Sequence, residues 1–162
     1  MLGSGGFGDV YKAQKVGTEE FYAIKTQYHD ASSRRADRLK IEASVMNAIN
    51  NFEDASRKNH LITLIDQGKT DQFQFIVMQL LGPSISDLRR YFICSEFSRS
   101  TAMRVSQQTL QGIWDLHVIG YLHKDIKPQN FAIGLNDKAH VVYLIDLGMA
   151  RKYIDQQTKK IK

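Results

Sequence analysis

Residues 123–130 have the sequence His-Lys-Asp-Ile-Lys-Pro-Gln-Asn, and this segment cannot form a regular helix. Pro128 lacks a backbone donor and disfavours helical geometry at the preceding residue, so Lys127 is expected to be extended. A rigid loop is therefore predicted, presenting the carboxylate of Asp125, the amine of Lys127 and the carboxamide of Asn130 toward one place. Such a trio suits phosphoryl transfer, which needs a hydroxyl oriented, phosphate charge neutralised and a divalent cation bound. Taken alone, the pattern is equally compatible with an ordinary polar surface loop.

A glycine-rich run near the N-terminus is a second candidate phosphate site. It consists of Gly3, Ser4, Gly5, Gly6, Phe7 and Gly8. The spacing G-x-G-x-x-G is weak evidence by itself, because glycine-rich starts also occur as linkers. A Rossmann unit would need a strand before the glycines and a helix after them. Instead, residues 10–14 and 21–25 are rich in strand formers and flank a turn at 16–20, which predicts an antiparallel hairpin.

Lys25 and Glu42 are predicted to form an ion pair. Between about residues 34 and 50, apolar residues recur at helical spacing, with Leu39 and Met46 on one face. Glu42 lies on that same face, where an unpaired carboxylate is costly to bury. Lys25, at the end of the second strand of the hairpin, is the obvious partner, although the strand pattern alone is typical of a surface lysine.

Two further strands are predicted at 61–66 and 73–79, with a turn at 68–71 between them. A Gly-Pro pair then ends the second of these strands. Ser84 follows and is expected to cap a short helix, because Asp87 lies three residues later as in a capping box.

A long helix is predicted at 98–117, and Gly120 is expected to end it. Its apolar positions form one stripe of Val105, Thr109, Ile113 and Leu116, and a second of Met103, Leu110 and Trp114. Trp114 and the methionine are expected to be core residues without a cofactor role. The two stripes together are too broad for one contact surface, so part of this helix is expected to pack on residues beyond Lys162.

The last apolar segments, 131–134 and 141–145, predict a ribbon around a turn at 135–140. This ribbon leads into Asp146, which follows Asp125 by 21 positions. An Asp-x-Gly after an apolar strand is common, but this placement relative to Asp125 is not. The Asp146 carboxylate is a hard oxygen donor, the kind of group that suits a hard cation.

In this order the motifs resemble the protein kinase family. The glycine run followed by a ribbon is similar to G-x-G-x-x-G-x-V, and residues 23–25 are similar to A-x-K. Residues 123–130 resemble H-R-D-x-x-x-x-N, and residues 146–148 resemble D-F-G. The resemblance covers essentially the whole chain. It implies an α+β, two-lobe fold, with an antiparallel N-lobe and hinge start in 1–81 and a partial helical C-lobe in 82–162.

The resemblance also implies ATP and Mg²⁺ as cofactors and gives each motif residue a role. Asp125 would orient the substrate hydroxyl and accept its proton late, and Lys127 would contact the γ-phosphate. Asn130 and Asp146 would hold Mg²⁺. Nucleotide contacts are expected from Gly3, Ser4, Gly5, Gly6, Phe7, Gly8, Val10, Ala23, Lys25, Glu42, Met78, Gln79, Leu80 and Leu81.

Among these nucleotide contacts, Val10 would pack on the adenine and Met78 would be the gatekeeper. The backbone of 79–81 would meet the adenine edge. His123 is expected to support the loop by packing and hydrogen bonding, without transferring a proton.

Within the kinases, residues 127–134 and 80–84 resemble the casein kinase 1 superfamily. Residues 15–20, 77–80 and 87–90 are most similar to its tau-tubulin kinase branch. Lys124 departs from the usual arginine, which puts regulation through a phosphorylated activation loop in doubt. Leu147 departs from phenylalanine but is expected to pack as a smaller plug. Because Lys162 follows Asp146 closely, the sequence is expected to be a kinase fragment that is poorly soluble and inactive on protein substrates by itself.

The formal net charge of +5 arises from 22 basic and 17 acidic residues. Part of the excess lies in 34–38 and 151–162, which fits acidic or phosphorylated protein partners, although each cluster is more simply a solvated face. The basic runs contain a single aromatic residue, Tyr153, and lack the repeated aromatics that favour single-strand binding, so nucleic acid is not an expected partner. The lone cysteine, Cys94, and the absence of a 20-residue apolar run favour the cytoplasm or nucleus and no membrane partner.

Three functions are compatible with this sequence. The expected function is that of an ATP- and Mg²⁺-dependent serine/threonine protein kinase. The alternative is a truncated kinase or pseudokinase that binds nucleotide or partners without turnover. A small-molecule phosphotransferase of the same fold is disfavoured by the casein kinase-like hinge and loop residues.

Overall fold

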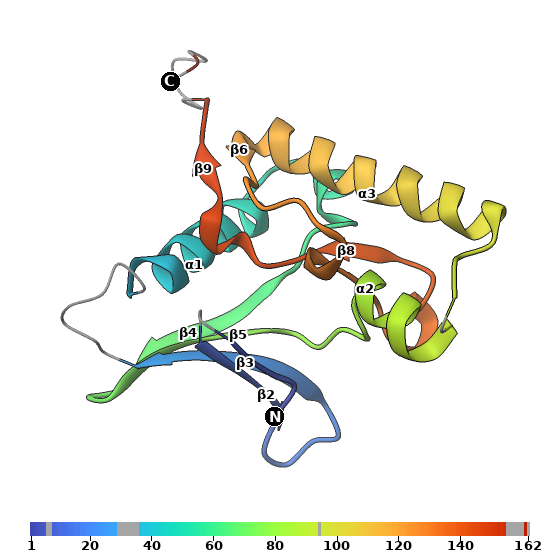
Figure 1. Cartoon of the computed structure of the whole chain (residues 1–162). Helices are drawn as coiled ribbons and strands as arrows, with labels where there is room; N and C mark the ends of the chain where they lie inside the picture. The colour runs from blue at the N-terminus through green and yellow to red at the C-terminus, as the bar shows by residue number, and fades with distance from the viewer. Residues whose placement is uncertain (6–7, 29–35, 94, 155–160, 162) are drawn as a thin grey trace.

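The computed structural model describes residues 1–5, 8–28, 36–93, 95–154 and 161. A twisted antiparallel sheet lies on one side of the helix α1, and the longer helix α3 lies on the other side, with short strands between them (Figure 1). The fold class is therefore α+β, as the sequence predicts. In the described part of the chain, no helix combines the length and apolar character needed to cross a bilayer.

The sheet has five strands, all paired antiparallel in the order β1-β2-β3-β5-β4. They are β1 (Gly3–Gly5), β2 (Gly8–Gln14), β3 (Phe21–Tyr28), β4 (Leu64–Lys69) and β5 (Phe73–Gln79). The predicted hairpin between β2 and β3 is confirmed. Its turn includes Gly17 with a φ of 78°, a left-handed conformation that glycine adopts without steric cost.

The strand predicted at 61–66 begins later, at Leu64, and extends to Lys69, so the predicted turn at 68–71 is shifted toward residues 70–72. The reason is that Leu61 is committed elsewhere, in a parallel bridge with Leu144. Thr70 closes the observed turn, because its hydroxyl accepts a hydrogen bond from the Phe73 N–H at 3.1 Å.

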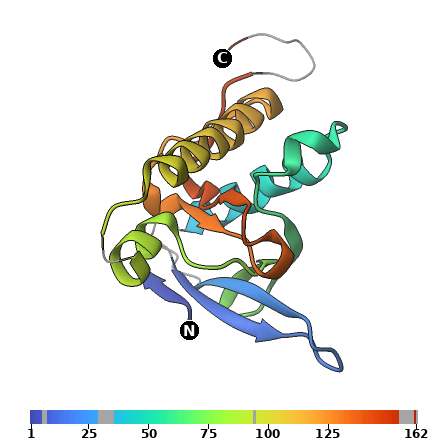
Figure 2. The same cartoon turned by 90° about the vertical axis from the view of Figure 1, so that its right-hand side faces the viewer.

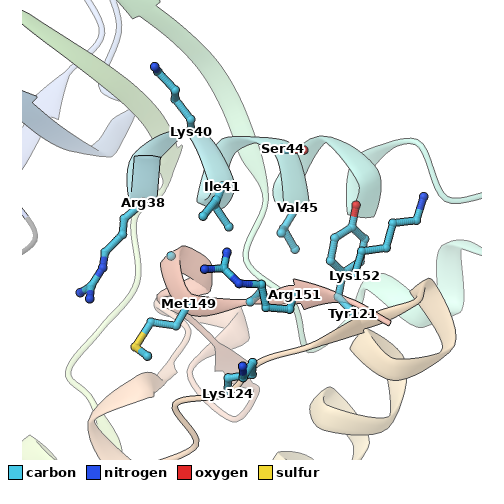
Figure 3. Close-up of a pocket in the computed structure, with 12 residues that line it drawn as sticks. Arg38, Lys40, Ile41, Ser44, Val45, Tyr121, Lys124, Met149, Arg151 and Lys152 are labelled. Carbon is cyan, nitrogen blue, oxygen red and sulfur yellow. The ribbon is translucent and has the colours of Figure 1, made fainter. Parts of the chain in front are cut away.

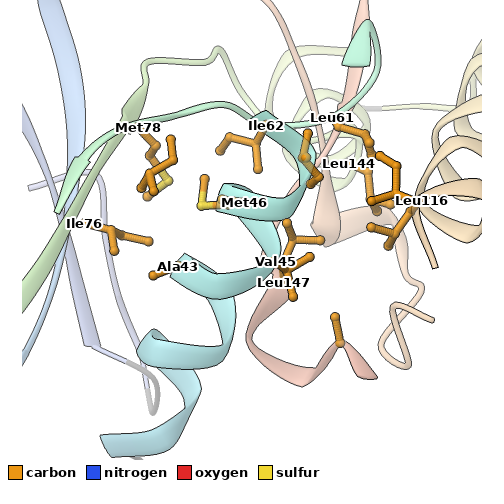
Figure 4. Close-up of a cluster of buried hydrophobic side chains, with 14 of the residues drawn as sticks. Ala43, Val45, Met46, Leu61, Ile62, Ile76, Met78, Leu116, Leu144 and Leu147 are labelled. Carbon is orange, nitrogen blue, oxygen red and sulfur yellow. The ribbon is translucent and has the colours of Figure 1, made fainter. Parts of the chain in front are cut away.

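Helix α1 (Ala36–Asn50) carries the core between the sheet and the rest of the molecule. The predicted helix covered 34–50, of which 34 and 35 lie outside the described residues. Leu39, Met46 and Ile49 are buried on one face, as their spacing predicts. Figure 4 shows Met46 of α1 among side chains that come from both sides of the helix, so the apolar core is continuous across α1.

The remaining elements follow the hinge. They are α2 (Ile85–Asp87), the π-helical η2 (Leu88–Ile93), α3 (Arg99–Ile119), β6 (Tyr121–Leu122), η3 (Pro128–Asn130), β7 (Phe131–Ile133), η4 (Asn136–Lys138), β8 (Val142–Leu144), η5 (Leu147–Met149) and β9 (Arg151–Lys152). Before the hinge, the connection between α1 and β4 contains the short helix η1 (Ala55–Lys58). The capping box of Ser84 and Asp87 is present, and β7 pairs with β8 as the predicted ribbon. The pairing of β6 with β9 has no counterpart in the sequence predictions.

Helix α3 runs along the outer side of the short strands (Figure 2). Gly120 ends it in a left-handed conformation, as expected. The prediction that Trp114 is a core residue is wrong, because its side chain is 59% exposed, and Met103 and Leu110 are exposed with it. The face that packs inward is centred on Gly112, Leu116 and Ile119, which places the second apolar stripe toward solvent.

The connection between α1 and β4 is bonded directly to β8. The N–H of Leu144 donates to the His60 carbonyl at 2.8 Å, and the N–H of Ile62 donates to the Leu144 carbonyl at 3.4 Å. Gly112 of α3 makes room for this connection, since a Cβ atom there would lie 3.2 Å from the His60 carbonyl oxygen. The sheet and the helical part of the molecule therefore meet at a second place besides the hinge.

Candidate active site

Lys25 and Glu42 form a buried ion pair. Lys25 lies in β3 and Glu42 on the inward face of α1, and the lysine Nζ is 2.7 Å from the glutamate Oε2. Burial lowers the pKa of Lys25, but the charges of Glu42 and Asp146 outweigh burial, so that its pKa is raised and the ammonium stays charged. Burial raises the pKa of Glu42, while Lys25 opposes that change. The predicted partners are thus together, and the pair ties α1 to the sheet.

Asp146 brings a second carboxylate to Lys25. Its Oδ1 lies 3.1 Å from the lysine Nζ. The residue has a φ of 60°, a left-handed conformation that is uncommon outside glycine and is often found at functional sites. Leu147, which follows it, is completely buried, so the leucine packs as the expected smaller plug.

The loop around Asp125 is held together by its own side chains. The Lys127 Nζ donates to the Asp125 Oδ2 at 2.7 Å, and the Asn130 Nδ2 donates to the same oxygen at 3.0 Å and to the Asp125 carbonyl at 2.8 Å. Lys127 is extended, as the following proline predicts. The hydrogen bond from Lys127, assisted by that from Asn130, holds the pKa of Asp125 below its usual value, so the carboxylate is ionised at neutral pH.

His123 supports the loop around Asp125 through two hydrogen bonds. Its side chain is buried, its Nε2 lies 2.9 Å from the Ile145 carbonyl, and its Nδ1 accepts a hydrogen bond from the Asp125 N–H at 3.2 Å. These partners assign the proton to Nε2. Burial lowers the pKa of His123, which keeps the ring neutral. The histidine therefore has the supporting position that the sequence predicts.

The two groups of side chains belong to one network. The Ile145 N–H donates to the Asn130 carbonyl at 2.9 Å, and the Ile145 carbonyl accepts from His123. Asp146 is the next residue along the chain. These hydrogen bonds therefore fix the position of Asp146 relative to the loop that holds Asp125, and the ion pair between Asp146 and Lys25 links that loop to the sheet.

The glycine-rich turn lies at the outer edge of the sheet. Gly3, Ser4 and Gly5 form β1, Gly5 is paired with Gly8, and Gly6 and Phe7 lie outside the described residues. Gly8 has a φ of 112°, and a Cβ atom there would collide with the Thr26 carbonyl oxygen. Only glycine fits this position.

The expected adenine contacts lie on the adjoining strands. Val10 is paired with Lys25, and Ala23 is paired with Met78. Ala23 and Met78 are both buried, and the Met78 side chain joins the core (Figure 4).

The hinge follows directly from β5. The Gln79 N–H donates to the Thr63 carbonyl at 3.3 Å, and the Gly82 N–H donates to the Ile133 carbonyl at 2.8 Å. Leu80 and Leu81, between these anchors, are half-buried, and in the described part of the chain no acceptor is bonded to the Leu81 N–H.

The site has the donor set that Mg²⁺ prefers. Both donors of the Asn130 amide are turned toward Asp125, which leaves its Oδ1 without a partner among the described residues. Asp146 supplies a partly exposed carboxylate. Within the described ranges no group of three or more His, Cys, Asp or Glu side chains could enclose a metal. One carboxylate and one carboxamide fit Mg²⁺, which keeps several waters and takes further oxygens from substrate phosphates.

A basic pocket lies beside the loop that holds Asp125, and sequence analysis did not predict it as a site. It is a cavity of about 810 Å³ between α1 and the β6–β9 pair. Figure 3 shows five cationic side chains lining it: Arg38, Lys40, Lys124, Arg151 and Lys152. The sequence places these residues in three separate clusters. The pairing of β6 with β9 brings Lys124 near Arg151 and Lys152, and the packing of Gly148 against Arg38 adds the cations of α1.

The chain matches the protein kinase domain model over residues 1–162. The chain belongs to the protein kinase family. Three similar proteins of Caenorhabditis elegans illustrate the match. "Putative serine/threonine-protein kinase ZK507.3" is 42% identical over 94% of this chain and 42% of its own length. "Serine/threonine-protein kinase spe-6" is 35% identical over 98% of this chain and 40% of its own length. "Putative casein kinase I C03C10.2" is 30% identical over 94% of this chain and 43% of its own length.

The kinase domain therefore has the predicted two-lobe kinase fold, with the antiparallel sheet and α1 as its N-lobe. The boundary between the lobes at residue 81 stays a prediction. The family implies ATP as the phosphoryl donor, a divalent metal and protein substrates. The chain spans about two fifths of the length of these relatives.

Proposed function

We propose that this kinase domain transfers the γ-phosphoryl group of ATP to serine and threonine hydroxyls of proteins. The observation that carries the proposal is the single network that joins Lys25, Glu42 and Asp146 to Asp125 and Asn130. These side chains come from four separate parts of the sequence, and each has the chemistry that a different part of phosphoryl transfer requires. The similarity to proteins named serine/threonine kinases supports the same function.

The nucleotide is held by the N-lobe and the hinge. The ammonium of Lys25 contacts the α- and β-phosphates, and Glu42 keeps it in position. The glycine-rich turn approaches the phosphates closely, because few side chains stand in the way. Val10 and Ala23 pack on the adenine, and the backbone of 79–81 meets its polar edge.

Asn130 and Asp146 hold Mg²⁺ through oxygen atoms. Bound there, Mg²⁺ would supply positive charge that offsets the negative charge of the phosphates during transfer. Lys25 holds the Asp146 carboxylate in place, and Asp125 holds the Asn130 amide. Both ligands are therefore oriented by their neighbours.

Asp125 orients the substrate hydroxyl and accepts its proton late, as the new O–P bond forms and ADP leaves. Its low pKa suits this order, because a weak base takes the proton only once the hydroxyl oxygen has become acidic through bond formation. Lys127 contacts the γ-phosphate and reduces the repulsion between the phosphate and the carboxylate.

A transfer assay tests the proposal. Full-length protein that contains this domain is incubated with radiolabelled ATP, Mg²⁺ and a casein-like substrate, and Asp125→Asn is compared with wild type. We expect labelled substrate with wild type and a loss of at least about 100-fold with Asp125→Asn, at unchanged nucleotide affinity. Nucleotide binding without transfer by wild type would instead support the pseudokinase alternative, and a preference for metabolites would support a small-molecule phosphotransferase.

We also place the kinase in the casein kinase 1 superfamily, near the tau-tubulin kinase branch. Residues 127–134 and 80–84 carry this assignment, and the similarity to a protein named as a casein kinase I supports it.

The proposed protein substrates carry acidic or phosphorylated residues near the target hydroxyl. The basic pocket of about 810 Å³ supports this preference, because its five cations adjoin the Asp125 loop through Lys124 and none of its lining residues is acidic. We expect a substrate peptide with a phosphoserine beside the target to be phosphorylated faster than its alanine counterpart. Arg151→Ala should remove most of that difference while leaving activity on the unphosphorylated peptide in place.

A further inference from the structure

A second polar cavity lies on another part of the molecule. It has a volume of about 630 Å³ and lies between α3, the turn that joins β7 to β8, and the connection that joins α1 to β4. It reaches the hinge at Gln79, but Lys25, Asp125, Asn130 and Asp146 are not among its lining residues. We call this cavity the α3 groove.

The α3 groove is basic. Lys58, Arg104 and Lys138 line it together with two histidines, and none of its described lining residues is an aspartate or a glutamate. Arg104 and Lys138 are exposed, and neither forms an ion pair within the described residues. Cations that face no carboxylate repel one another, so this arrangement favours an anionic occupant.

The walls of the α3 groove are fixed by hydrogen bonds. Gln108 of α3 donates from Nε2 to the His140 carbonyl at 3.0 Å, and its Oε1 accepts from the Val142 N–H at 2.8 Å. On the other side, the His60 Nδ1 lies 2.9 Å from the Val142 carbonyl. The cations thus stand on a preformed surface, which reduces the entropy that an occupant would lose on binding.

The polar groups of the α3 groove also suit a polypeptide. Asn59, Gln79 and Gln107 line it with side-chain amides, which can both donate to and accept from a peptide backbone. An unstacked nucleic acid would need exposed aromatic rings, but the tyrosine of the groove, Tyr143, is buried. The chemistry therefore favours an acidic peptide over a nucleic acid.

We propose that the α3 groove binds an acidic, extended segment of a partner protein, at a site separate from the proposed catalytic cleft. Carboxylates of the segment pair with Arg104 and Lys138, and its backbone bonds to the amide side chains. Such a site would hold a partner or substrate by a segment remote from the hydroxyl that is phosphorylated.

Fluorescence anisotropy tests this proposal. A short fluorescein-labelled peptide of glutamate and glycine is titrated with the protein at low ionic strength, and a glutamine-glycine peptide is the neutral control. We compare wild type with Arg104→Glu/Lys138→Glu. The matched control is Lys69→Glu/Arg89→Glu, which reverses two exposed cations outside the groove.

We expect the acidic peptide to bind wild type and the control similarly, and the groove variant at least about tenfold more weakly, because attraction is replaced by repulsion. A third variant, Lys124→Glu/Arg151→Glu, separates this site from the basic pocket beside the catalytic cluster. Loss of binding in that variant, with retention in Arg104→Glu/Lys138→Glu, would overturn the proposal. Equal binding of the glutamine peptide would overturn it as well.

Carbodiimide cross-linking of wild type gives an independent readout that does not depend on a variant folding. The reagent joins peptide carboxylates to nearby lysine amines, and mass spectrometry locates the joined lysines. We expect cross-links to Lys58 or Lys138. Cross-links confined to Lys124 and Lys152 would contradict the α3 groove as the binding site. Because neither readout uses phosphoryl transfer, its result is independent of the catalytic proposal.

Discussion

Lys25 and Glu42 form an ion pair of 2.7 Å that joins a strand to a helix, and both side chains are buried. Since Lys25 also contacts Asp146, the position of α1 affects both the proposed phosphate contact and the proposed metal ligand.

Glu42→Gln should therefore lower phosphoryl transfer even though the glutamate does not itself contact ATP. Glutamine fits the same space but lacks the charge that positions Lys25, and small displacements at a reacting centre are costly. We expect a decrease in kcat/KM of at least about tenfold, and a larger one for Lys25→Met. Glu53→Gln, at an exposed position after α1, is the control and should be without effect. Normal turnover of Lys25→Met at saturating ATP would mean that another lysine contacts the phosphates.

Asp146→Asn should reduce activity by orders of magnitude at low Mg²⁺. The substitution removes the anionic ligand while preserving size, so the fold should persist. We expect a loss of about 100-fold or more, partly recovered at high Mg²⁺, in a transfer assay at several metal concentrations. Asp137→Asn, on the exposed turn between β7 and β8, should leave the metal dependence unchanged. If Asp146→Asn did the same, the metal assignment would be wrong.

His123 should make the domain less stable as the pH falls from neutral. Burial lowers its pKa, whereas in the unfolded chain the pKa is about 6.5. Below about pH 6.5 the unfolded state binds the proton more readily than the folded state, so the free energy of unfolding decreases with decreasing pH until the folded-state pKa is reached. We expect Tm to fall across this window, and to fall less steeply in His123→Gln.

Asp125 also contributes to the pH dependence of stability, but in a lower pH range than His123. Its pKa is lowered, so its stabilising effect is present above the unfolded value of about 3.9 and is lost only as the pH falls through the folded value.

The control for the His123 prediction is His140→Gln, at an exposed histidine, which should keep the pH dependence of wild type. An equally steep dependence in His123→Gln would exclude His123 as the cause.

Arg57 should stabilise the contact between η1 and α3. The carboxylate of Asp115 is completely buried, its Oδ1 is 3.0 Å from the Arg57 Nη1, and its Oδ2 has no partner among the described residues. Arg57→Met would leave this buried carboxylate without its cation, although Gln111 Nε2 still donates to Oδ1 at 2.8 Å, and we expect Tm to fall by roughly 10 °C. Arg57→Met/Asp115→Leu should recover most of the loss, as a double-mutant cycle would show. Equal losses in the single and the double variant would mean that the ion pair contributes little.

Sequence analysis predicts the ion pair between Lys25 and Glu42, because it follows from the periodicity of one helix and the cost of burying a charge. Glu42 carries this prediction, since a carboxylate on an apolar helical face needs a cation wherever the helix packs. The burial of Leu39 and Met46 follows from the same periodicity. For the glycine turn the comparison with the prediction is less complete, because Gly6 and Phe7 lie outside the described residues.

Features that depend on distant pairing were not predictable in this way. The strand β4 begins later than predicted because Leu61 lies in a parallel bridge with Leu144, some 80 positions later, and no local pattern records that partner. The five cations of the basic pocket were likewise separate clusters until β6 and β9 paired. Trp114 was assigned to the core because helical periodicity identifies two apolar stripes without showing which of them faces inward.

The hydrogen bonds of Leu144 with His60 and Ile62 affect how the two halves of the domain can move. Together with the hinge after Gln79 they form two attachments between the backbones of the two halves, and two points define an axis. Opening and closing of the cleft should then be a rotation about the line between them rather than a sliding of one half over the other. The strand order places β4 and β5 next to this axis and β1 and β2 at the far edge of the sheet (Figure 1). A small angular change at the hinge is therefore amplified at Gly8, so the glycine turn should travel farthest while Lys25 moves less.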